Sequence, residues 1–101
     1  IRVEIVSVSH LDSETGEVGV TGKVQGVGFR AAAARHAHLH EVTGWVRNAP
    51  DGSVELLLQG KTDKVDRLLS WLYQGPEHAR VEHVHVIRSY DDRRYQHFQI
   101  R

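Results

Sequence analysis

The residues best suited to chemistry lie in one short segment, residues 25–30 (QGVGFR), between a predicted strand and a predicted helix. Gly26 and Gly28 let the backbone turn tightly, which brings successive N–H groups to one point. The first N–H groups of the following helix have no partner within it and carry the positive end of its dipole. Arg30, in the first turn, can donate two hydrogen bonds to one phosphate group. This segment, the anion loop, therefore predicts a phosphate site.

Three interpretations of the anion loop compete. The simplest is a glycine turn beside an exposed arginine. The second is a dinucleotide fingerprint, because Gly26, Gly28 and Ala31 match G-x-G-x-x-A. That fingerprint needs a parallel βαβ unit, whereas Asp51-Gly52 turns the next strand directly into a hairpin. A P-loop is excluded because no Gly-Lys-Ser or Gly-Lys-Thr follows. The third interpretation is a phosphate site that works without metal or nucleotide.

The elements that position the anion loop follow from hydrophobic periodicity and turn residues. Alternation at Val18, Val20, Gly22 and Val24 predicts a strand before the loop, and an alanine-rich stretch over 29–41 predicts a helix after it. Before this strand we expect a strand-like segment at 1–5 and a turn at 12–16. After the helix we expect a hairpin of strands 42–48 and 54–58, and then a second helix, capped by Thr62 or Asp63 and ended by Gly75-Pro76. The last two strands are expected at 81–87 and 95–100, around a turn at 91–94.

The order of these elements predicts the fold. Leaving the first stretch aside, the order is βαββαβ, which indicates an α+β ferredoxin-like sandwich: an antiparallel sheet with two helices on one face. Trp45 and Trp71 are expected to pack between sheet and helices. We expect an N-terminal extension over residues 1–16, containing the extra strand-like segment, and a domain over 17–101.

The composition excludes several classes of protein. The chain has 101 residues, with 13 Lys and Arg against 13 Asp and Glu and no cysteine. Disulfides, zinc–thiolate sites and cysteine nucleophiles are therefore impossible. Balanced charge disfavours an electrostatic nucleic-acid binder. No apolar run reaches the roughly 18 residues of a membrane span, and no signal pattern opens the chain. We expect a cytoplasmic protein that binds neither nucleic acid nor membrane.

The eight histidines raise the question of a metal site. His36 and His40 are four apart on a predicted helix, a spacing that can bind a metal. No Glu-x-x-His context or carboxylate pattern accompanies them. His83 and His85 share one face of a predicted strand, which we expect to be a polar face of the sheet. We therefore predict no metal and no other cofactor.

The anion loop and the following hairpin together carry a family resemblance. Residues 22–30 (GKVQGVGFR), residues 44–48 (GWVRN) and Asp51-Gly52 resemble the acylphosphatase family, and the similarity continues to Phe98-Gln99-Ile100. The resemblance implies a ferredoxin-like fold and hydrolysis of small acyl phosphates to a carboxylate and inorganic phosphate. It marks two catalytic positions, which match Arg30 and Asn48. It assigns phosphate binding to the loop amides of Gln25, Gly26, Val27, Gly28, Phe29 and Arg30.

This chain departs from the family pattern in three places. His40-Glu41 replaces the Leu-Gly with which the family usually ends its first helix, so the usual glycine C-cap is missing. Ala49 follows Asn48 where Ser, Thr or Leu is common. Residues 1–16 extend beyond the usual N-terminus. None of these departures touches the two catalytic positions.

The few functional groups indicate the mechanism. Near the anion loop, Thr21 and Thr43 are the closest hydroxyls and neither has an obvious base, so we expect water to attack phosphorus directly. Phosphoryl transfer requires mainly positioning and charge stabilisation. The leaving carboxylate has a conjugate acid of pKa near 4, so no general acid is required. We expect Arg30 and the loop amides to hold the phosphoryl group and Asn48 to hold the water. Inorganic phosphate, the product, should then inhibit competitively.

Two other functions have the same order of elements. An RNA-recognition module needs stacking aromatics on its third element, and residues 53–59 contain none. A similar domain opens larger carbamoyltransferase maturation proteins, where the loop motif is usually followed by proline, whereas Ala31 follows Arg30 here. A free-standing, monomeric enzyme is our expectation, although the extra strand-like segment could pair with a neighbour. Nothing in the sequence marks a pocket for the acyl group.

Overall fold

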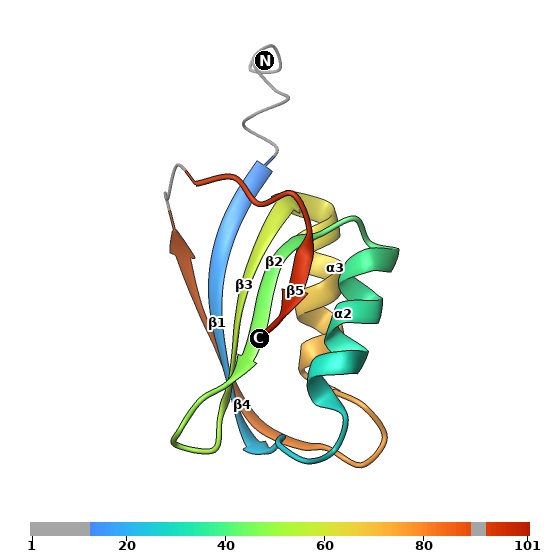
Figure 1. Ribbon diagram of the computed structural model, residues 1–101, viewed down its shortest axis with the longest axis vertical. Helices are drawn as coiled ribbons and strands as arrows, with labels where there is room; N and C mark the ends of the chain where they lie inside the picture. Colours follow the sequence, from blue (N-terminus) through green and yellow to red (C-terminus); the bar gives the residue numbers. More distant parts are fainter. Residues whose placement is uncertain (1–12, 90–92) are drawn as a thin grey trace.

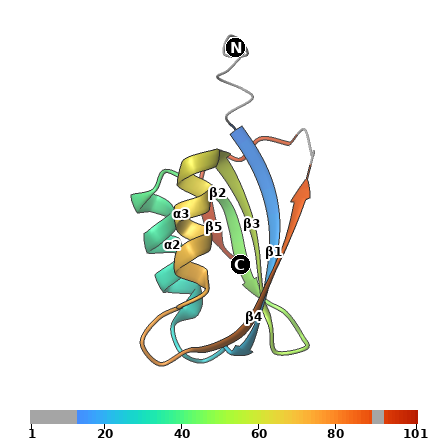
Figure 2. The same cartoon turned by 180° about the vertical axis from the view of Figure 1, so that it is seen from behind.

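A five-stranded sheet with both helices on one face forms the molecule (Figures 1 and 2). The computed structural model describes residues 13–89 and 93–101. The strand order is β4-β1-β3-β2-β5, and the expected ferredoxin-like sandwich is confirmed. The elements are β1 (Ser13–Lys23), α2 (Phe29–Leu39), β2 (Thr43–Asn48), β3 (Val54–Lys61), α3 (Thr62–Leu72), β4 (Arg80–Ser89) and β5 (Phe98–Ile100).

The sheet is not antiparallel throughout. The β1–β3, β1–β4 and β2–β3 pairs are antiparallel, but β5 pairs parallel with β2. The expectation of an antiparallel sheet is therefore wrong for β5, because the chain crosses from β4 at one edge to the opposite edge and returns beside β2. The side chain of Gln59 on β3 holds this crossing. Its Nε2 donates to the carbonyl of Arg93 at 2.8 Å, and its Oε1 accepts from the N–H of Tyr95 at 2.9 Å.

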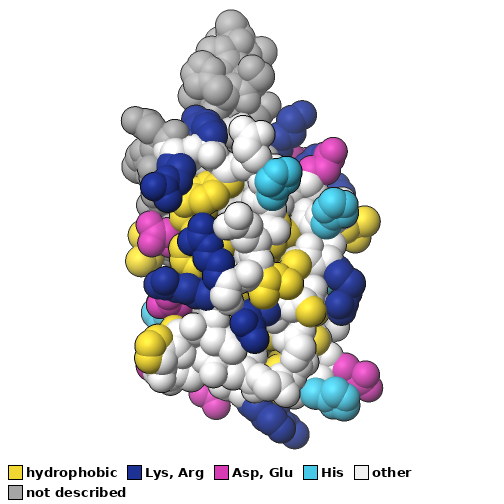
Figure 3. Space-filling view, viewed as in Figure 1, with side chains coloured by type: hydrophobic (Ala, Val, Ile, Leu, Met, Phe, Trp, Pro, Cys, Tyr) yellow, Lys and Arg dark blue, Asp and Glu magenta, His cyan; other side chains and the backbone are white. Residues whose placement is uncertain are grey.

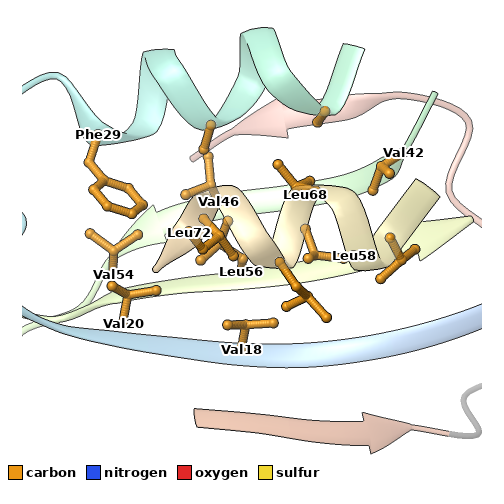
Figure 4. Close-up of a cluster of buried hydrophobic side chains, with 14 of the residues drawn as sticks. Val18, Val20, Phe29, Val42, Val46, Val54, Leu56, Leu58, Leu68 and Leu72 are labelled. Carbon is orange, nitrogen blue, oxygen red and sulfur yellow. The ribbon is translucent and has the colours of Figure 1, made fainter. Parts of the chain in front are cut away.

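The core lies between the sheet and the two helices (Figure 4). Alternate residues of the strands point into it, and α3 contributes an i, i+3, i+4, i+7 stripe. Burying one such side chain stabilises the fold by about 1.5–3 kcal/mol. Its fully buried members include Val20, Phe29, Val46, Val54, Leu56, Leu58, Val65, Leu68 and Leu72.

The turn expected at 12–16 is wrong over residues 13–16, which belong to β1. Ser13 to Gly16 pair with β3, and Thr15 and Gly16 pair with β4 as well. Hydrogen bonding to neighbouring strands thus outweighs the local turn preference of these polar residues. The strand-like segment expected at 1–5 lies outside the described residues. The division at 16/17 stays a prediction, and it falls within a continuous strand.

The two tryptophans differ in their packing. Val46 points into the core, so the neighbouring Trp45 faces the uncovered side of the sheet and the expectation for it is wrong. The guanidinium groups of Arg47 and Arg101 each lie 5.1 Å from its ring centroid. Trp71 packs against the core, where its ring stacks 4.1 Å from that of His36 on α2. The second tryptophan therefore joins the helices to each other.

The ends of α3 show one further difference from expectation. Thr62 is already helical, and the preceding Lys61 is the N-cap residue, in an extended conformation. The chain passes directly from β3 into α3, which leaves no separate capping residue between them.

In the part of the chain that the structure describes, no helix is long and apolar enough to cross a membrane.

Helix α2 ends in a geometry that normally selects glycine. Glu41 follows the last turn with φ 57°, in the left-handed region. Its N–H donates to the carbonyl of His38 at 3.2 Å. The N–H of Val42 donates to the carbonyl of Ala37 at 2.8 Å, which completes a Schellman motif. Helix α2 therefore ends in a Schellman motif even without the usual glycine, but Glu41 is held in a strained left-handed conformation.

Replacing Glu41 with glycine is expected to raise the melting temperature by about 5 °C. Glycine adopts the left-handed conformation without steric cost, whereas Glu41 contributes only an exposed ion pair with Lys64. Thermal unfolding followed by circular dichroism measures the effect. Lys64→Ala, which removes the ion pair alone, is the control and should not raise the melting temperature. An unchanged or lower value for Glu41→Gly would contradict the assigned strain.

Candidate active site

The anion loop connects β1 to α2 at one end of the sheet (Figure 1). Gly26 and Gly28 have φ of 75° and 77°, so the loop requires residues that adopt the left-handed region freely. Gly28 is the N-cap residue of α2 and has no side chain to satisfy the first helical N–H groups. Among the described residues, none accepts a hydrogen bond from the backbone N–H groups of residues 25–31. These donors are available to an anion.

Side chains of the anion loop anchor it on both sides. Phe29 is buried in the core, and Val27 packs against the same cluster. Gln25 reaches across to the β2–β3 hairpin, where its Nε2 donates to the carbonyls of Ala49 at 2.8 Å and Ser53 at 2.9 Å. Gln25 therefore links the loop to the hairpin that carries Asn48. The sequence indicated Gln25 only through its backbone amide.

Asn48 is the last residue of β2, and the turn after it is tightly held. The N–H of Ala49 donates to the carbonyl of Ser53 at 2.8 Å. The carboxylate of Asp51 accepts from the Ser53 hydroxyl at 2.6 Å and from its N–H at 2.9 Å. These two hydrogen bonds hold the pKa of Asp51 below its usual value. Ala49 itself is buried, so a larger side chain would have little space there.

One cavity of about 240 Å³ joins these parts. It brings Arg30 and Asn48 together with both loop glycines, which lie far from Asn48 in the sequence. Ile100 enters the cavity because β5 pairs it with Val46, two residues before Asn48. Sequence reasoning included Ile100 in the family pattern without giving it a role. The lining residues are Val24, Gly26, Gly28, Phe29, Arg30, Ala31, Asn48 and Ile100.

Arg30 lines this cavity. Its Nη1 donates to the backbone carbonyl of Arg101 at 3.1 Å. Within residues 13–89 and 93–101, no carboxylate side chain forms an ion pair with Arg30. A planar cation and several N–H donors around one small cavity can bind the oxygens of a tetrahedral dianion. The carboxamide of Asn48 adds a neutral donor and acceptor at the same cavity.

None of the described histidines lines this cavity. His36 stacks on Trp71, and its ring centroid is 6.4 Å from that of His40. Partial burial lowers the pKa of His36, and the nearby His40 and Arg35 lower it further. His83 and His85 are exposed on the uncovered face of the sheet, as expected. Among the described residues, no three His, Asp or Glu side chains are grouped so that they could hold a metal ion.

The chain is similar in sequence to known proteins over nearly its whole length. The family model described as acylphosphatase matches residues 16–100. A curated acylphosphatase from Bordetella parapertussis is 52% identical over 91 residues, which cover 90% of this chain and 97% of the relative. One from Paraburkholderia xenovorans is 51% identical over 86 residues, covering 85% of this chain and 89% of the relative.

Solved structures agree with the sequence relatives. An acylphosphatase from Coxiella burnetii superposes with a TM-score of 0.88 at 35% identity, covering 94% of this chain and 99% of that one. Full-length HypF superposes with a TM-score of 0.80 at 20% identity, covering 87% of this chain but only 12% of HypF. The likeness to HypF shows a shared fold alone. The matched residues include the anion loop and the β2–β3 hairpin, and the chain belongs to the acylphosphatase family.

Proposed function

We propose that this acylphosphatase cleaves small acyl phosphates with one loop and two side chains. Arg30 and the backbone amides from Gln25 to Arg30 bind the phosphoryl group, and Asn48 positions the attacking water. The observation that carries the proposal is the single cavity that contains the loop glycines, Arg30 and Asn48. These groups come from α2, β2 and the loop before α2, and they meet only through the tertiary fold.

The electrostatics of the cavity favour a phosphoryl group. The N–H donors at the start of α2 carry the positive end of the helix dipole. Arg30 adds a full charge with a planar fork of donors that matches two phosphate oxygens. Such donors stabilise the negative charge on the equatorial oxygens as the bond to the leaving group breaks. The loop and Arg30 therefore account for both binding and charge stabilisation.

Direct attack of water is the chemistry that these groups support. The hydroxyl of Thr43 donates to the carbonyl of Gln59 at 3.3 Å, so it is already engaged elsewhere, and the chain has no cysteine. In the proposed step, the water oxygen bonds to phosphorus and the phosphorus–oxygen bond to the acyl group breaks. The bond's electron pair leaves with the carboxylate, and the water proton is lost to solvent. The carboxamide of Asn48 accepts a hydrogen bond from the water and so orients it.

The expected assay result is hydrolysis of acetyl phosphate at a rate that EDTA does not change. Arg30 and the amides neutralise the phosphoryl charge, so no divalent ion is needed. Inorganic phosphate should raise KM and leave kcat unaltered, because it occupies the same cavity as the substrate. Release of acetate and phosphate, measured with and without chelator, checks both statements. A large loss with EDTA that a divalent ion restores would contradict the proposal.

Other expectations of the sequence stay predictions. They are a monomeric state, a cytoplasmic location, and an N-terminal extension that contributes nothing to the cavity. The alternative, a domain of a larger carbamoyltransferase maturation protein, receives less support. The chain is 52% identical to a relative named acylphosphatase but only 20% identical to HypF.

A further inference from the structure

A groove of about 1010 Å³ continues from the catalytic cavity along α2. It lies between α2 and the edge formed by β2 and β5. Ala31 and Ile100 line both the cavity and the groove, so the two spaces meet at these residues. Ile100 is 51% exposed, so a large apolar side chain is accessible where the two spaces meet.

The direction of the groove is set by α2 and β2. Ala31, Arg35 and His38 line it and are spaced i, i+4 and i+7, so they follow one face of the helix away from its N-terminus. The groove extends to Thr43 at the start of β2, whereas Asn48 is at the end of that strand. It thus leads away from Asn48 over about 10 Å of helix.

This direction agrees with the geometry of the reaction. In phosphoryl transfer the attacking and leaving oxygens lie roughly in line on opposite sides of phosphorus. If Asn48 holds the water, the acyl group leaves on the side opposite Asn48. The groove leads toward Thr43, at the end of β2 opposite Asn48, and its volume of about 1010 Å³ leaves room for an acyl chain.

The lining chemistry changes along the groove. Where it meets the cavity it is apolar, with Ala31 and Ile100. The apolar lining continues with Ala34 on α2 and with Phe98, which pairs with Gly44 near the far end. Farther along it has basic and N–H-bearing side chains from Arg35, His38 and His97. Figure 3 shows dark-blue (Lys or Arg) and cyan (His) side chains on the side of the molecule where α2 lies.

Only one acidic side chain, Glu41, lines the described groove. Its carboxylate already pairs with Lys64 on α3, and that hydrogen bond holds its pKa below the usual value. Arg35 forms no ion pair with any described residue. Arg35 therefore has no counter-ion among the described residues, and the one carboxylate of the groove is paired with a lysine outside the lining.

We propose that this groove binds the acyl group of the substrate and favours acyl phosphates whose apolar chain ends in a carboxylate. The apolar chain would lie on Ala34, Phe98 and Ile100, and its terminal carboxylate would face Arg35. This inference rests on the proposed function, because it assumes that the phosphoryl group occupies the catalytic cavity.

Three synthetic substrates test the groove: acetyl phosphate, octanoyl phosphate and the monophosphate of octanedioic acid. Acetyl phosphate is too short to leave the cavity, and the other two differ only in the terminal carboxylate. We expect kcat/KM to rise from the first to the third. Arg35→Ala should lower kcat/KM for the octanedioic substrate about fivefold, a magnitude typical of an exposed charge pair, and leave the other two unchanged. Arg67→Ala, on the exposed side of α3, is the matched control.

A second variant tests the apolar part of the groove. Ala34→Leu narrows it, so we expect about a tenfold loss for both long substrates and an unchanged rate for acetyl phosphate. Equal effects of Arg35→Ala or Ala34→Leu on all three substrates, or no effect on any, would overturn the acyl groove. Failure of the unaltered enzyme to hydrolyse acetyl phosphate would overturn the proposed function itself. Melting temperatures within about 3 °C of the unaltered chain establish that the variants are folded.

Discussion

Arg30→Ala is expected to lower kcat/KM by about 10³-fold or more and to weaken inhibition by inorganic phosphate at the same time. Arg30 lines the cavity together with the loop glycines. In the proposed mechanism it contacts the phosphoryl group both in the bound substrate and as charge moves in the transition state. Losing it should therefore raise the phosphate inhibition constant and reduce kcat together. Initial rates with acetyl phosphate at several phosphate concentrations measure both quantities.

Two further variants make the test of Arg30 specific. Arg30→Lys should recover little activity, because one ammonium cannot reproduce the planar fork of donors. Arg47→Ala, on the uncovered face of the sheet, removes an arginine that pairs with Glu55 and should leave the kinetics unchanged. Because Arg30 also donates to the carbonyl of Arg101, each variant needs a melting curve. Unaltered phosphate inhibition in folded Arg30→Ala would exclude the assigned role.

Asn48→Ala is expected to reduce kcat about 10²-fold while phosphate inhibition stays nearly the same. In the proposed mechanism Asn48 orients the water and contributes little to binding of the phosphoryl group. Its side chain lines the cavity, and among the described residues it has no hydrogen-bond partner that the substitution would leave unpaired. The loss should therefore appear in kcat and not in the phosphate inhibition constant.

The Asn48 variant has two internal comparisons. Gln74→Ala removes an exposed carboxamide just beyond α3 and should have no kinetic effect. Asn48→Asp keeps the shape of the side chain but places a negative charge beside the phosphoryl group. It should therefore weaken phosphate inhibition and also lower kcat. If folded Asn48→Ala turns over normally, or loses phosphate inhibition as severely as Arg30→Ala, Asn48 does not have the role assigned to it.

Local sequence determined the parts of this protein whose structure depends on nearby residues. Gly26 and Gly28 adopt the left-handed conformations that an anion loop needs, and no distant contact is required to specify them. The apolar stripe of α3 and the turn at Asp51-Gly52 are likewise short-range patterns, and both form as expected. The order of the elements then indicated the sandwich. Arg30 was indicated by the anion loop itself, whereas Asn48 was indicated only by the family resemblance.

The features that depend on pairing between distant strands, such as the position of β5, were decided only by the tertiary structure. The short strand β5 could join either edge of the sheet, and its place beside β2 follows from the crossing held by Gln59. That pairing brings Ile100 into the cavity and forms one wall of the groove, which no local pattern predicts. Trp45 faces away from the helices because the alternation of β2 assigns the core side to Val46. The apolar character of a side chain does not decide on which face of the sheet it lies, because that is set by the register of the strand.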